Sequence, residues 1–273
     1  MLNGSATPPE AARPGLVVAI ANQKGGVGKT TTAINLGASL ALEGHRVLLL
    51  DLDPQGNAST GLGVRIADGG RSIYSVLIGH SALDEVVVPT TVDNLALAPS
   101  SIDLAGAELE MVSMMSREKR LAAAIAPVAG DYDTILVDCA PSLGLLTINA
   151  LAAAHELLIP VQCEFYALEG LGQLMDSIDL VRNSLNSELH IGSVLLTMFD
   201  ARTKLSTDVA IQIRDYFGER VFRTVIPRSI RLSEAPSYGE PIELYDRMSP
   251  GAVAYRYVAR EYLQRHRQQE PAR

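Results

Sequence analysis

The sequence contains no tryptophan, few other aromatic residues and only two cysteines, Cys139 and Cys163. The cysteines are far apart, form no C-x-x-C pair and lie in apolar runs. We therefore expect buried free thiols, and neither a disulfide nor a metal-thiolate site. The five histidines show no ligand spacing, so we expect no metal site made from side chains alone.

Long apolar segments are also absent. No apolar run approaches about 20 residues, the length that a helix needs to cross a bilayer. Residues 1–14 contain proline, alanine and serine but no charged region followed by an apolar block. We therefore expect a disordered N-terminal tail and not a signal peptide, which places the protein in the cytoplasm.

The net charge of −8 argues weakly against a nucleic acid partner. The charge is uneven, however, because residues 200–231 hold seven basic residues against four acidic ones. The basic residues are Arg202, Lys204, Arg214, Arg220, Arg223, Arg228 and Arg231. A local basic face can bind phosphate backbones, although on charge alone a solvated surface is the simpler interpretation.

Apolar runs alternate with segments of helical spacing along the 273 residues. Strands are predicted at 16–22, 46–52, 94–98, 134–139, 156–162, 190–198 and 221–226. Helices are predicted at 31–43, 117–129, 168–183, 207–217 and 252–268, and the last should dock on the domain. Region 61–100 is irregular, and we expect excursions from the sheet there. The alternation predicts an α/β fold: a doubly wound, mostly parallel sheet with helices on both faces.

The first strand is followed by a glycine-rich stretch, residues 24–31 (KGGVGKTT). Its glycines let the backbone amides of Gly25, Gly26, Val27 and Gly28 point inward at a phosphate. The ordinary pattern G-x-x-x-x-G-K-[ST] would begin with glycine at position 23, which is Gln23, and a second lysine, Lys24, follows it. The stretch thus predicts a phosphate-binding loop of unusual form.

The residues after these glycines are of the types that bind the phosphates and the metal ion of a nucleotide. Lys29 would neutralise the β- and γ-phosphates, the Thr30 hydroxyl would ligate Mg²⁺, and Thr31 would bond the α-phosphate. Asp138 ends an apolar run and would hold Mg²⁺ through a water. Asp53 stands at the tip of another strand, where it can orient or deprotonate a water, whereas Asp51 is more often structural.

Residues 22–32 (NQKGGVGKTTT) and 51–57 (DLDPQGN) resemble the ParA/Soj family of chromosome and plasmid partitioning ATPases, among the deviant Walker P-loop NTPases related to MinD. The resemblance continues in residues 136–142, 197–203 and 225–237. It implies one ATPase domain over residues 15–268, followed by a tail at 269–273.

The family implies roles for matching positions. Lys24 matches the signature lysine that touches the nucleotide of the other subunit, Asp53 the catalytic aspartate and Asp138 the Walker B residue. Pro227 and Ser229 lie in the loop around the adenine. ATP or ADP and Mg²⁺ are the implied cofactors. Ala140, Ala201 and Ser229 depart from residues common in relatives, and Ser229 in place of asparagine puts the base contact in doubt.

The resemblance also implies partners. Arg202 and Arg231 match arginines implicated in DNA binding, and Arg228 lies in the same block. The implied protein is a weak ATPase whose ATP-dependent homodimer binds double-stranded DNA non-specifically, on the nucleoid. A ParB-type centromere-binding protein would stimulate its hydrolysis.

Two other classes compete with this interpretation. A MinD-like ATPase at the membrane surface needs a C-terminal amphipathic helix with a strong apolar face, and residues 257–268 lack one. An electron-transfer ATPase like the nitrogenase iron protein needs paired cluster cysteines, and Cys163 has no matching motif around it.

Overall fold

A seven-stranded sheet forms the centre of the computed structural model, which describes residues 14–67, 69–164 and 167–269. The strands run in the order β3-β4-β2-β5-β1-β6-β7. They are β1 (Leu16–Ile20), β2 (Val47–Leu52), β3 (Val88–Pro89), β4 (Leu95–Ala98), β5 (Thr134–Cys139), β6 (Glu156–Gln162) and β7 (His190–Thr197). Neighbouring strands are parallel except β3 and β4. The predicted mostly parallel, doubly wound sheet is therefore confirmed.

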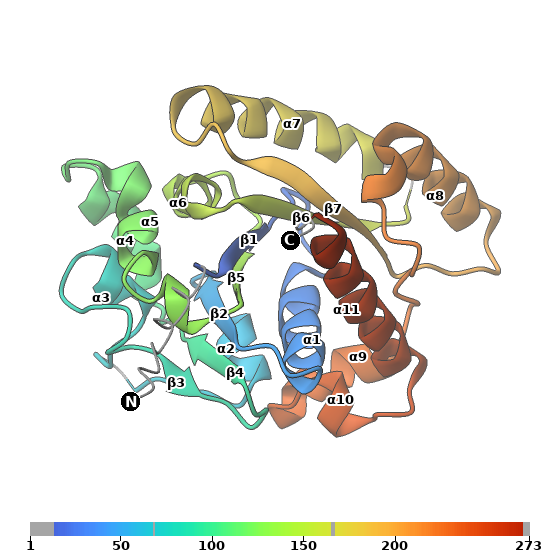
Figure 1. Cartoon of the computed structure of the whole chain (residues 1–273), viewed down its shortest axis with the longest axis horizontal. Coiled ribbons are helices and arrows are strands. Elements are labelled where there is room, and N and C mark those ends of the chain that lie inside the picture. Colours follow the sequence, from blue (N-terminus) through green and yellow to red (C-terminus); the bar gives the residue numbers. More distant parts are fainter. Residues whose placement is uncertain (1–13, 68, 165–166, 270–273) are drawn as a thin grey trace, which may run out of the picture.

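Helices cover both faces of this sheet (Figure 1). They are α1 (Lys29–Leu42), α2 (Asn57–Gly61), α3 (Ile73–Leu77), α4 (Leu104–Met111), α5 (Arg120–Ile125), α6 (Leu145–Ala153), α7 (Ala167–Ser184), α8 (Lys204–Phe217), α9 (Ile230–Glu234), α10 (Ile242–Tyr245) and α11 (Pro250–Gln269). Short helices and β3 fill the region predicted to be irregular. Apart from Pro14 and Gln269, the two expected tails lie outside the described residues.

The strands bury side chains on both faces because parallel sheets are covered on both sides. Along β1, Val17 and Ala19 pack in one apolar cluster with side chains of α3 to α8, while Val18 and Ile20 pack in another with α1 and α11. Successive residues of each apolar run thus point to opposite faces of the sheet, and each face packs into its own core.

Residues 221–226 are not a strand, and that prediction is wrong. The segment follows the free edge of β7, where the amides of Phe222 and Ile226 donate to β7 carbonyls at 2.9 and 2.8 Å. Between them, the amides of Arg223 and Thr224 donate instead to the carboxylate of Glu261 on α11. Because the Glu261 carboxylate accepts these two amides, they do not pair with β7. Within residues 221–226 the β-pairing with β7 is therefore limited to an isolated bridge between Val194 and Val221.

The C-terminal helix α11 docks on the domain, as predicted. It packs beside α1 (Figure 1) and buries Tyr255, Val258, Ala259 and Tyr262 in the core. The hydroxyl of Tyr255 lies 3.2 Å from that of Thr32 on α1. None of the described helices is long and apolar enough to cross a membrane.

Candidate nucleotide site

The glycine-rich loop connects β1 to α1 at the carboxyl end of the sheet. Gly26 and Gly28 have φ angles of 73° and 90°, a left-handed conformation that glycine adopts readily because it has no Cβ. Gly28 directly precedes the first turn of α1, where unpaired amides and the helix dipole attract anions. The hydroxyl of Thr197 on β7 donates to the Val27 carbonyl at 2.8 Å and ties the loop to the sheet. This is the geometry of a phosphate-binding loop.

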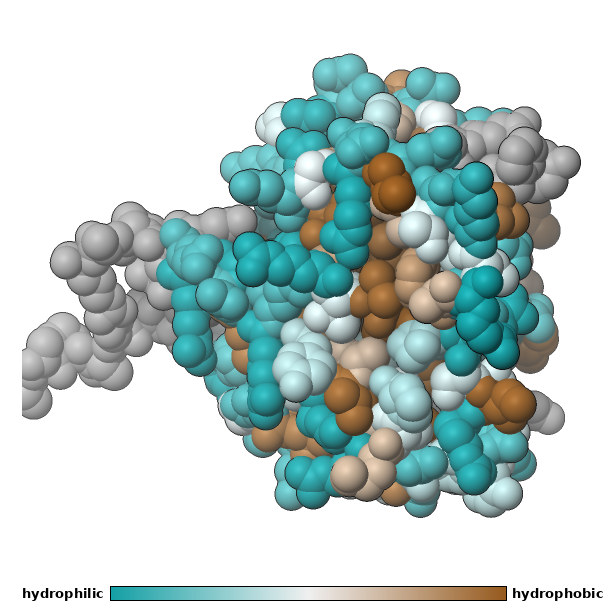
Figure 2. Space-filling view, turned by 90° about the vertical axis from the view of Figure 1, so that its right-hand side faces the viewer, coloured by the Kyte–Doolittle hydropathy of each residue, from teal (hydrophilic) through white to brown (hydrophobic). Residues whose placement is uncertain are grey.

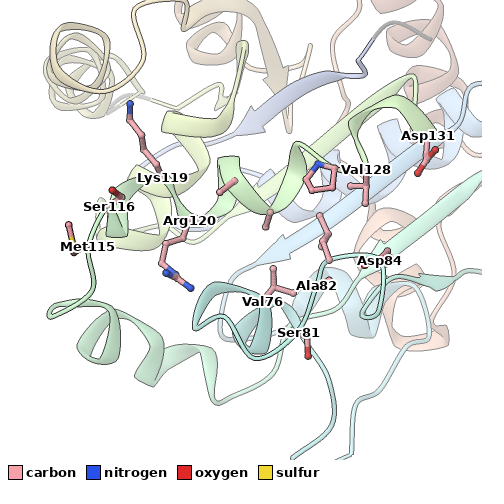
Figure 3. Close-up of a pocket in the computed structure, with 14 residues that line it drawn as sticks. Val76, Ser81, Ala82, Asp84, Met115, Ser116, Lys119, Arg120, Val128 and Asp131 are labelled. Carbon is pink, nitrogen blue, oxygen red and sulfur yellow. The ribbon is translucent and has the colours of Figure 1, made fainter. Parts of the chain in front are cut away.

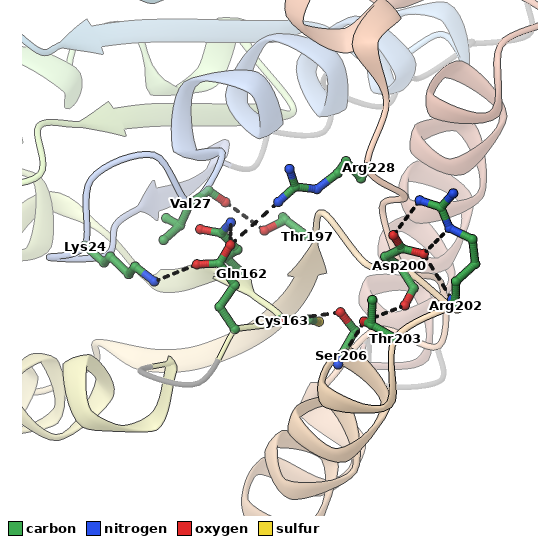
Figure 4. A network of polar contacts seen from close by, with 11 residues as sticks. Lys24, Val27, Gln162, Cys163, Thr197, Asp200, Arg202, Thr203, Ser206 and Arg228 are labelled. Carbon is green, nitrogen blue, oxygen red and sulfur yellow. Dashed lines mark hydrogen bonds and ion pairs between the residues drawn. The ribbon is translucent and has the colours of Figure 1, made fainter.

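The two lysines of the loop extend to different places. Lys29 opens α1, is 7% exposed, and donates from Nζ to the Lys24 carbonyl at 3.1 Å. Burial lowers the pKa of Lys29, and the charge of Asp138 opposes that change. The Nζ of Lys24 lies instead 3.4 Å from Oε2 of Glu164 (Figure 4). The side chain of Lys29 therefore lies over its own loop, whereas the side chain of Lys24 extends away from that loop.

Two buried carboxylates stand side by side at this edge. Asp51 on β2 and Asp138 on β5 occupy paired register positions, and neither side chain is exposed. Burial, together with the charge of Asp51, raises the pKa of Asp138 well above its usual range. Burial also raises the pKa of Asp51, to about 6. A cation placed here would stabilise the charged form of both groups.

The partners of the carboxylates distinguish their roles. Asp51 accepts hydrogen bonds from the amide and hydroxyl of Ser59 at 2.7 and 2.6 Å, which supports the structural role expected for it. Asp53 is 7% exposed, and its Oδ1 accepts the Gln55 amide at 2.9 Å. The Ser100 hydroxyl, at the end of β4, donates to the Asp53 carbonyl at 2.7 Å. Asp53 is thus held at the strand tip with one carboxylate oxygen without a partner among the described residues.

A magnesium ion fits the residues that are present. Neither carboxylate oxygen of the fully buried Asp138 has a hydrogen-bond partner in the described part of the chain. A buried acceptor without a partner is costly, and a hard cation with oxygen ligands would satisfy it. Within residues 14–67, 69–164 and 167–269, no group of three or more His, Cys, Asp or Glu side chains could hold a metal. Thr30, which was expected as a ligand, together with water and a bound phosphate would supply further oxygen ligands.

The loop predicted to border the adenine follows the edge of β7. The backbone of Pro227 forms a bridge with Phe199, and Ser229 precedes the first turn of α9. Arg228 lies between them, 63% exposed in its side chain, with Nη2 3.6 Å from Oε1 of Glu164. Glu164 thus contacts both Arg228 and Lys24, which brings one predicted DNA-binding residue close to the phosphate loop.

The other two arginines lie farther along the surface, and both are paired with carboxylates of their own chain. Arg202 is 87% exposed and lies 2.7 Å from Asp200, and its hydrogen bonds lower the pKa of Asp200 to about 2. Arg231 lies 3.0 Å from Glu234 and 3.5 Å from Asp246. The face that includes α8, α9 and α11 mixes hydrophilic and apolar side chains (Figure 2).

Comparison with known proteins identifies the family. The sporulation initiation inhibitor protein Soj of Bacillus subtilis is 55% identical over 247 residues, which cover 90% of this chain and 98% of Soj. The chromosome partitioning protein ParA of Myxococcus xanthus is 50% identical, over 95% of this chain and 92% of its own. The chain belongs to the Soj/ParA family of chromosome partitioning ATPases. A family model described as an AAA domain also matches residues 15–191 of this Soj/ParA protein.

Solved structures share the fold of this Soj/ParA chain. A Mycobacterium smegmatis protein named cobyrinic acid a,c-diamide synthase, with bound ADP and magnesium, superposes with a TM-score of 0.82 at 39% identity. It covers 94% of this chain and 97% of its own. The septum site-determining protein MinD from Pyrococcus horikoshii, complexed with Mg-ADP, has a TM-score of 0.73 at 25% identity, over 90% and 95% of the two chains.

Several residues of the site were not found by sequence reasoning. Glu164 follows β6 in no recognised motif, Ser59 lies just before the region predicted to be irregular, and Ser100 lies at its end. Asn22 and Thr197 belong to the Soj/ParA-like blocks, yet nothing in the sequence shows their contacts. The side chain of Asn22 donates to the Pro160 carbonyl at 2.8 Å and accepts the Lys24 amide at 3.0 Å. The only sequence signal for such site residues is a polar residue at the end of an apolar run.

Proposed function

We propose that this chain is an ATPase that forms a homodimer around two ATP molecules with Mg²⁺ and binds double-stranded DNA without sequence specificity. The main observation behind the proposal is that the side chains of Lys24 and Lys29 extend in different directions. Lys29 is buried over its own loop, whereas Lys24 extends away from it to Glu164. A lysine directed out of its own loop could extend to the phosphates of a second subunit once it leaves Glu164. ATP would then hold the dimer together, and its hydrolysis would release it.

Each residue of the proposed site has a definite task. Lys29 and the amides of residues 25–28 bind the phosphates, and Thr31 bonds the α-phosphate. Thr30 and Asp138 would hold Mg²⁺, the latter through a water. When bound, the ion would supply positive charge that stabilises negative charge on the phosphates. Asp53 orients the attacking water. Pro227 and Ser229 border the base.

Binding to DNA would use Arg202, Arg228 and Arg231. Phosphate contacts by arginine provide affinity without sequence information, which suits a protein that uses the whole nucleoid as its track. All three are exposed, but each is paired with a carboxylate of its own chain, so one subunit offers little free positive charge. A dimer would double the number of arginines that contact one DNA duplex. A ParB-type partner on centromere-like sites would stimulate hydrolysis.

The membrane-surface alternative is supported by the likeness to MinD. It requires a helix with an apolar face free to insert into a bilayer. Helix α11 packs against α1 and buries Tyr255, Val258, Ala259 and Tyr262, and of its large apolar side chains only Tyr257 is strongly exposed among the described residues. This packing favours the DNA-binding function.

One experiment separates the two functions. The full chain is titrated with random-sequence duplex DNA and with anionic phospholipid vesicles, each with ATP, with ADP and without nucleotide. We expect binding to DNA only with ATP, at protein concentrations that also give a dimer in sedimentation. Equal DNA binding with ADP, or ATP-dependent binding to vesicles, would overturn the proposal.

A further inference from the structure

The side chain of Arg231 on α9 is held by acidic residues at the ends of two short helices. Its Nη1 lies 3.0 Å from Oε2 of Glu234, the last residue of α9, and its Nε lies 3.5 Å from Oδ2 of Asp246, directly after α10. The hydroxyl of Tyr245, the last residue of α10, lies 3.5 Å from the same Nη1. A DNA phosphate and Asp246 would therefore compete for one guanidinium, and the separation of α9 and α10 determines how firmly Asp246 holds it.

Helix α10 is fastened to α1 by one buried side chain. Asn35, which is 4% exposed, lies in the second turn of α1. Its Nδ2 donates to the Thr31 carbonyl at 2.8 Å, and its Oδ1 accepts the Ile242 amide, at the start of α10, at 2.7 Å. The Ile242 carbonyl in turn accepts the Asp246 amide at 2.8 Å. Hydrogen bonds thus connect Thr31, which is expected to bond the α-phosphate, to the residue that pairs with Arg231.

Helix α9 rests on a different part of the nucleotide site. The turn Ala235–Tyr238, which continues α9, packs against α2, the helix that follows the segment of Asp53. After this turn, a Cβ added to Gly239 would lie 2.7 Å from the Cα of Gly63, so the two backbones approach more closely than a larger residue allows. The α9 side of the segment is thus fixed on α2, and the α10 side on α1. A change in the spacing of α1 and α2 would therefore change the spacing of Arg231 and Asp246.

Both supporting helices begin beside the proposed ATP. Helix α1 starts at Lys29, directly after the phosphate loop, and α2 starts shortly after Asp53. ATP would contact the segments before both helices, whereas ADP lacks the γ-phosphate, whose attacking water Asp53 is proposed to orient. The presence of the γ-phosphate is therefore the event that can alter how α1 and α2 are spaced.

We propose that Asn35 is a positioning residue for DNA binding, because it makes α10, and with it Asp246, follow the position of the phosphate loop. This inference rests on the proposed ATP-dependent DNA binding, and it names the residue that couples the two sites within one subunit. With ATP, α10 moves away from α9, and Asp246 releases Arg231 to a DNA phosphate. Without the Asn35 side chain, α10 stays beside α9, and the pair of Arg231 and Asp246 persists in every nucleotide state.

The chain contains a matched control for Asn35. Asn149 on α6 is also buried, donates to the carbonyl four positions earlier at 2.9 Å, and accepts the distant amide of Leu121 at 3.1 Å. It fastens the start of α5, beside a cavity of about 780 Å³ that Lys119 and Arg120 border (Figure 3). This region packs on the other face of the sheet from α1 and α10. Loss of either asparagine removes the same kinds of hydrogen bonds, but from different faces of the sheet.

The test compares Asn35→Ala, Asn149→Ala and Asp246→Asn in the full chain. With a non-hydrolysable ATP analogue, sedimentation measures the dimer, and fluorescence anisotropy measures the Kd for a random-sequence duplex. We expect Asn35→Ala to raise this Kd about tenfold with unchanged dimerisation, within the range usual for coupling between two sites. Asn149→Ala should leave the Kd unchanged. Asp246→Asn should lower it about two- to fivefold, because the exposed pair with Arg231 is lost.

The double variant Asn35→Ala/Asp246→Asn separates positioning from a general loss of stability. If Asn35 acts through Asp246, the double variant binds DNA as Asp246→Asn does. If the double variant binds as weakly as Asn35→Ala, the proposal is wrong. Equal effects of Asn35→Ala and Asn149→Ala, or an unchanged Kd for Asp246→Asn, would overturn it as well. Loss of the dimer in Asn35→Ala would also overturn it, since self-association and not α10 would then depend on Asn35.

Hydrogen exchange tests the same connection without DNA. Relative to ADP, the ATP analogue should alter amide exchange in residues 230–246 of the wild type and of Asn149→Ala, but not of Asn35→Ala. If the wild type binds no DNA with the ATP analogue, the proposed DNA-binding function fails, and hydrogen exchange still decides whether Asn35 connects the phosphate loop to this segment. The same change in the wild type and Asn35→Ala, or no change in either, would refute that connection.

Discussion

The side chain of Glu164 holds Lys24, a residue 140 positions earlier in the chain, at 3.4 Å. Its other carboxylate oxygen accepts the Gln162 amide at 2.6 Å and faces Arg228. One carboxylate thus contacts the lysine proposed to reach a second subunit and an arginine proposed to contact DNA. The Lys24 and Glu164 side chains are 34 and 45% exposed, so solvent screens their pairing and it contributes at most about 1 kcal/mol.

Replacement of Glu164 by glutamine should release Lys24. In the proposed dimer, Lys24 must leave Glu164 before it reaches the second nucleotide, so we expect Glu164→Gln to lower the ATP concentration for half-maximal dimerisation about two- to fivefold. Sedimentation at increasing ATP concentration measures this. Glu85→Gln, which removes a comparable exposed pair with Arg71, should have no effect. An unchanged or higher ATP requirement would show that Glu164 does not restrain Lys24.

Asp53→Ala should leave ATP-dependent dimerisation intact and lower phosphate release by about 100-fold or more, because a positioned base contributes at least that factor. Single-turnover phosphate release and sedimentation measure the two effects separately. Asp93→Ala, at an exposed position, is the control. Undiminished release would exclude Asp53 as the residue that orients water.

Arg231→Ala should weaken binding to DNA of any sequence and reduce the salt dependence of that binding, since each phosphate contact releases counterions. ATP-dependent dimerisation should persist. Anisotropy with labelled duplexes from about 50 to 200 mM salt measures the slope. Arg71→Ala is the control, because Arg71 is an exposed arginine far from Arg231 in the sequence. A variant that no longer dimerises would place Arg231 in the subunit interface.

The contact between His266 and Glu156 predicts a pH-dependent stability. The Nε2 of His266 lies 2.7 Å from Oε2 of the buried Glu156. Burial acts to lower the pKa of His266, but the bond to Glu156 outweighs it and raises that pKa above its ordinary value. A raised folded-state pKa stabilises the fold fully below the unfolded pKa of about 6.5. This stabilisation is lost as the pH rises through the folded-state pKa.

We therefore expect His266→Gln to reduce the free energy of unfolding by about 1 kcal/mol or more at low pH. The difference from the wild type should shrink as the pH rises through the folded-state pKa. Urea unfolding from about pH 5.5 to 9 measures this difference. His190→Gln, at an exposed position, should show no such trend. A constant or growing difference with rising pH would contradict the assignment of the proton to this pair.

Much of the fold could be predicted because its signals are local. The six strands of the parallel part of the sheet and the helix after the glycine loop appear in the sequence as apolar runs and helical spacing. The phosphate loop could be predicted for the same reason, since glycines, lysine and threonine act within a few residues of one another. Residues 221–226 show the limit of this reasoning. Their β-branched pattern suits a strand, but Glu261 of α11 removes the amides that a strand would need.

By itself, the sequence determined the alternation of the six parallel strands with helices along the chain, the phosphate loop and the candidate carboxylates, because each depends on residues close together in the chain. Only the tertiary structure decided which distant groups meet. It places Asp51 beside Asp138 and gives the carboxylate oxygens of Asp138 no hydrogen-bond partner among the described residues. It also brings Lys24 and Arg228 to Glu164. Such contacts depend on how strands are ordered and how loops close over their ends, and no local pattern encodes that arrangement.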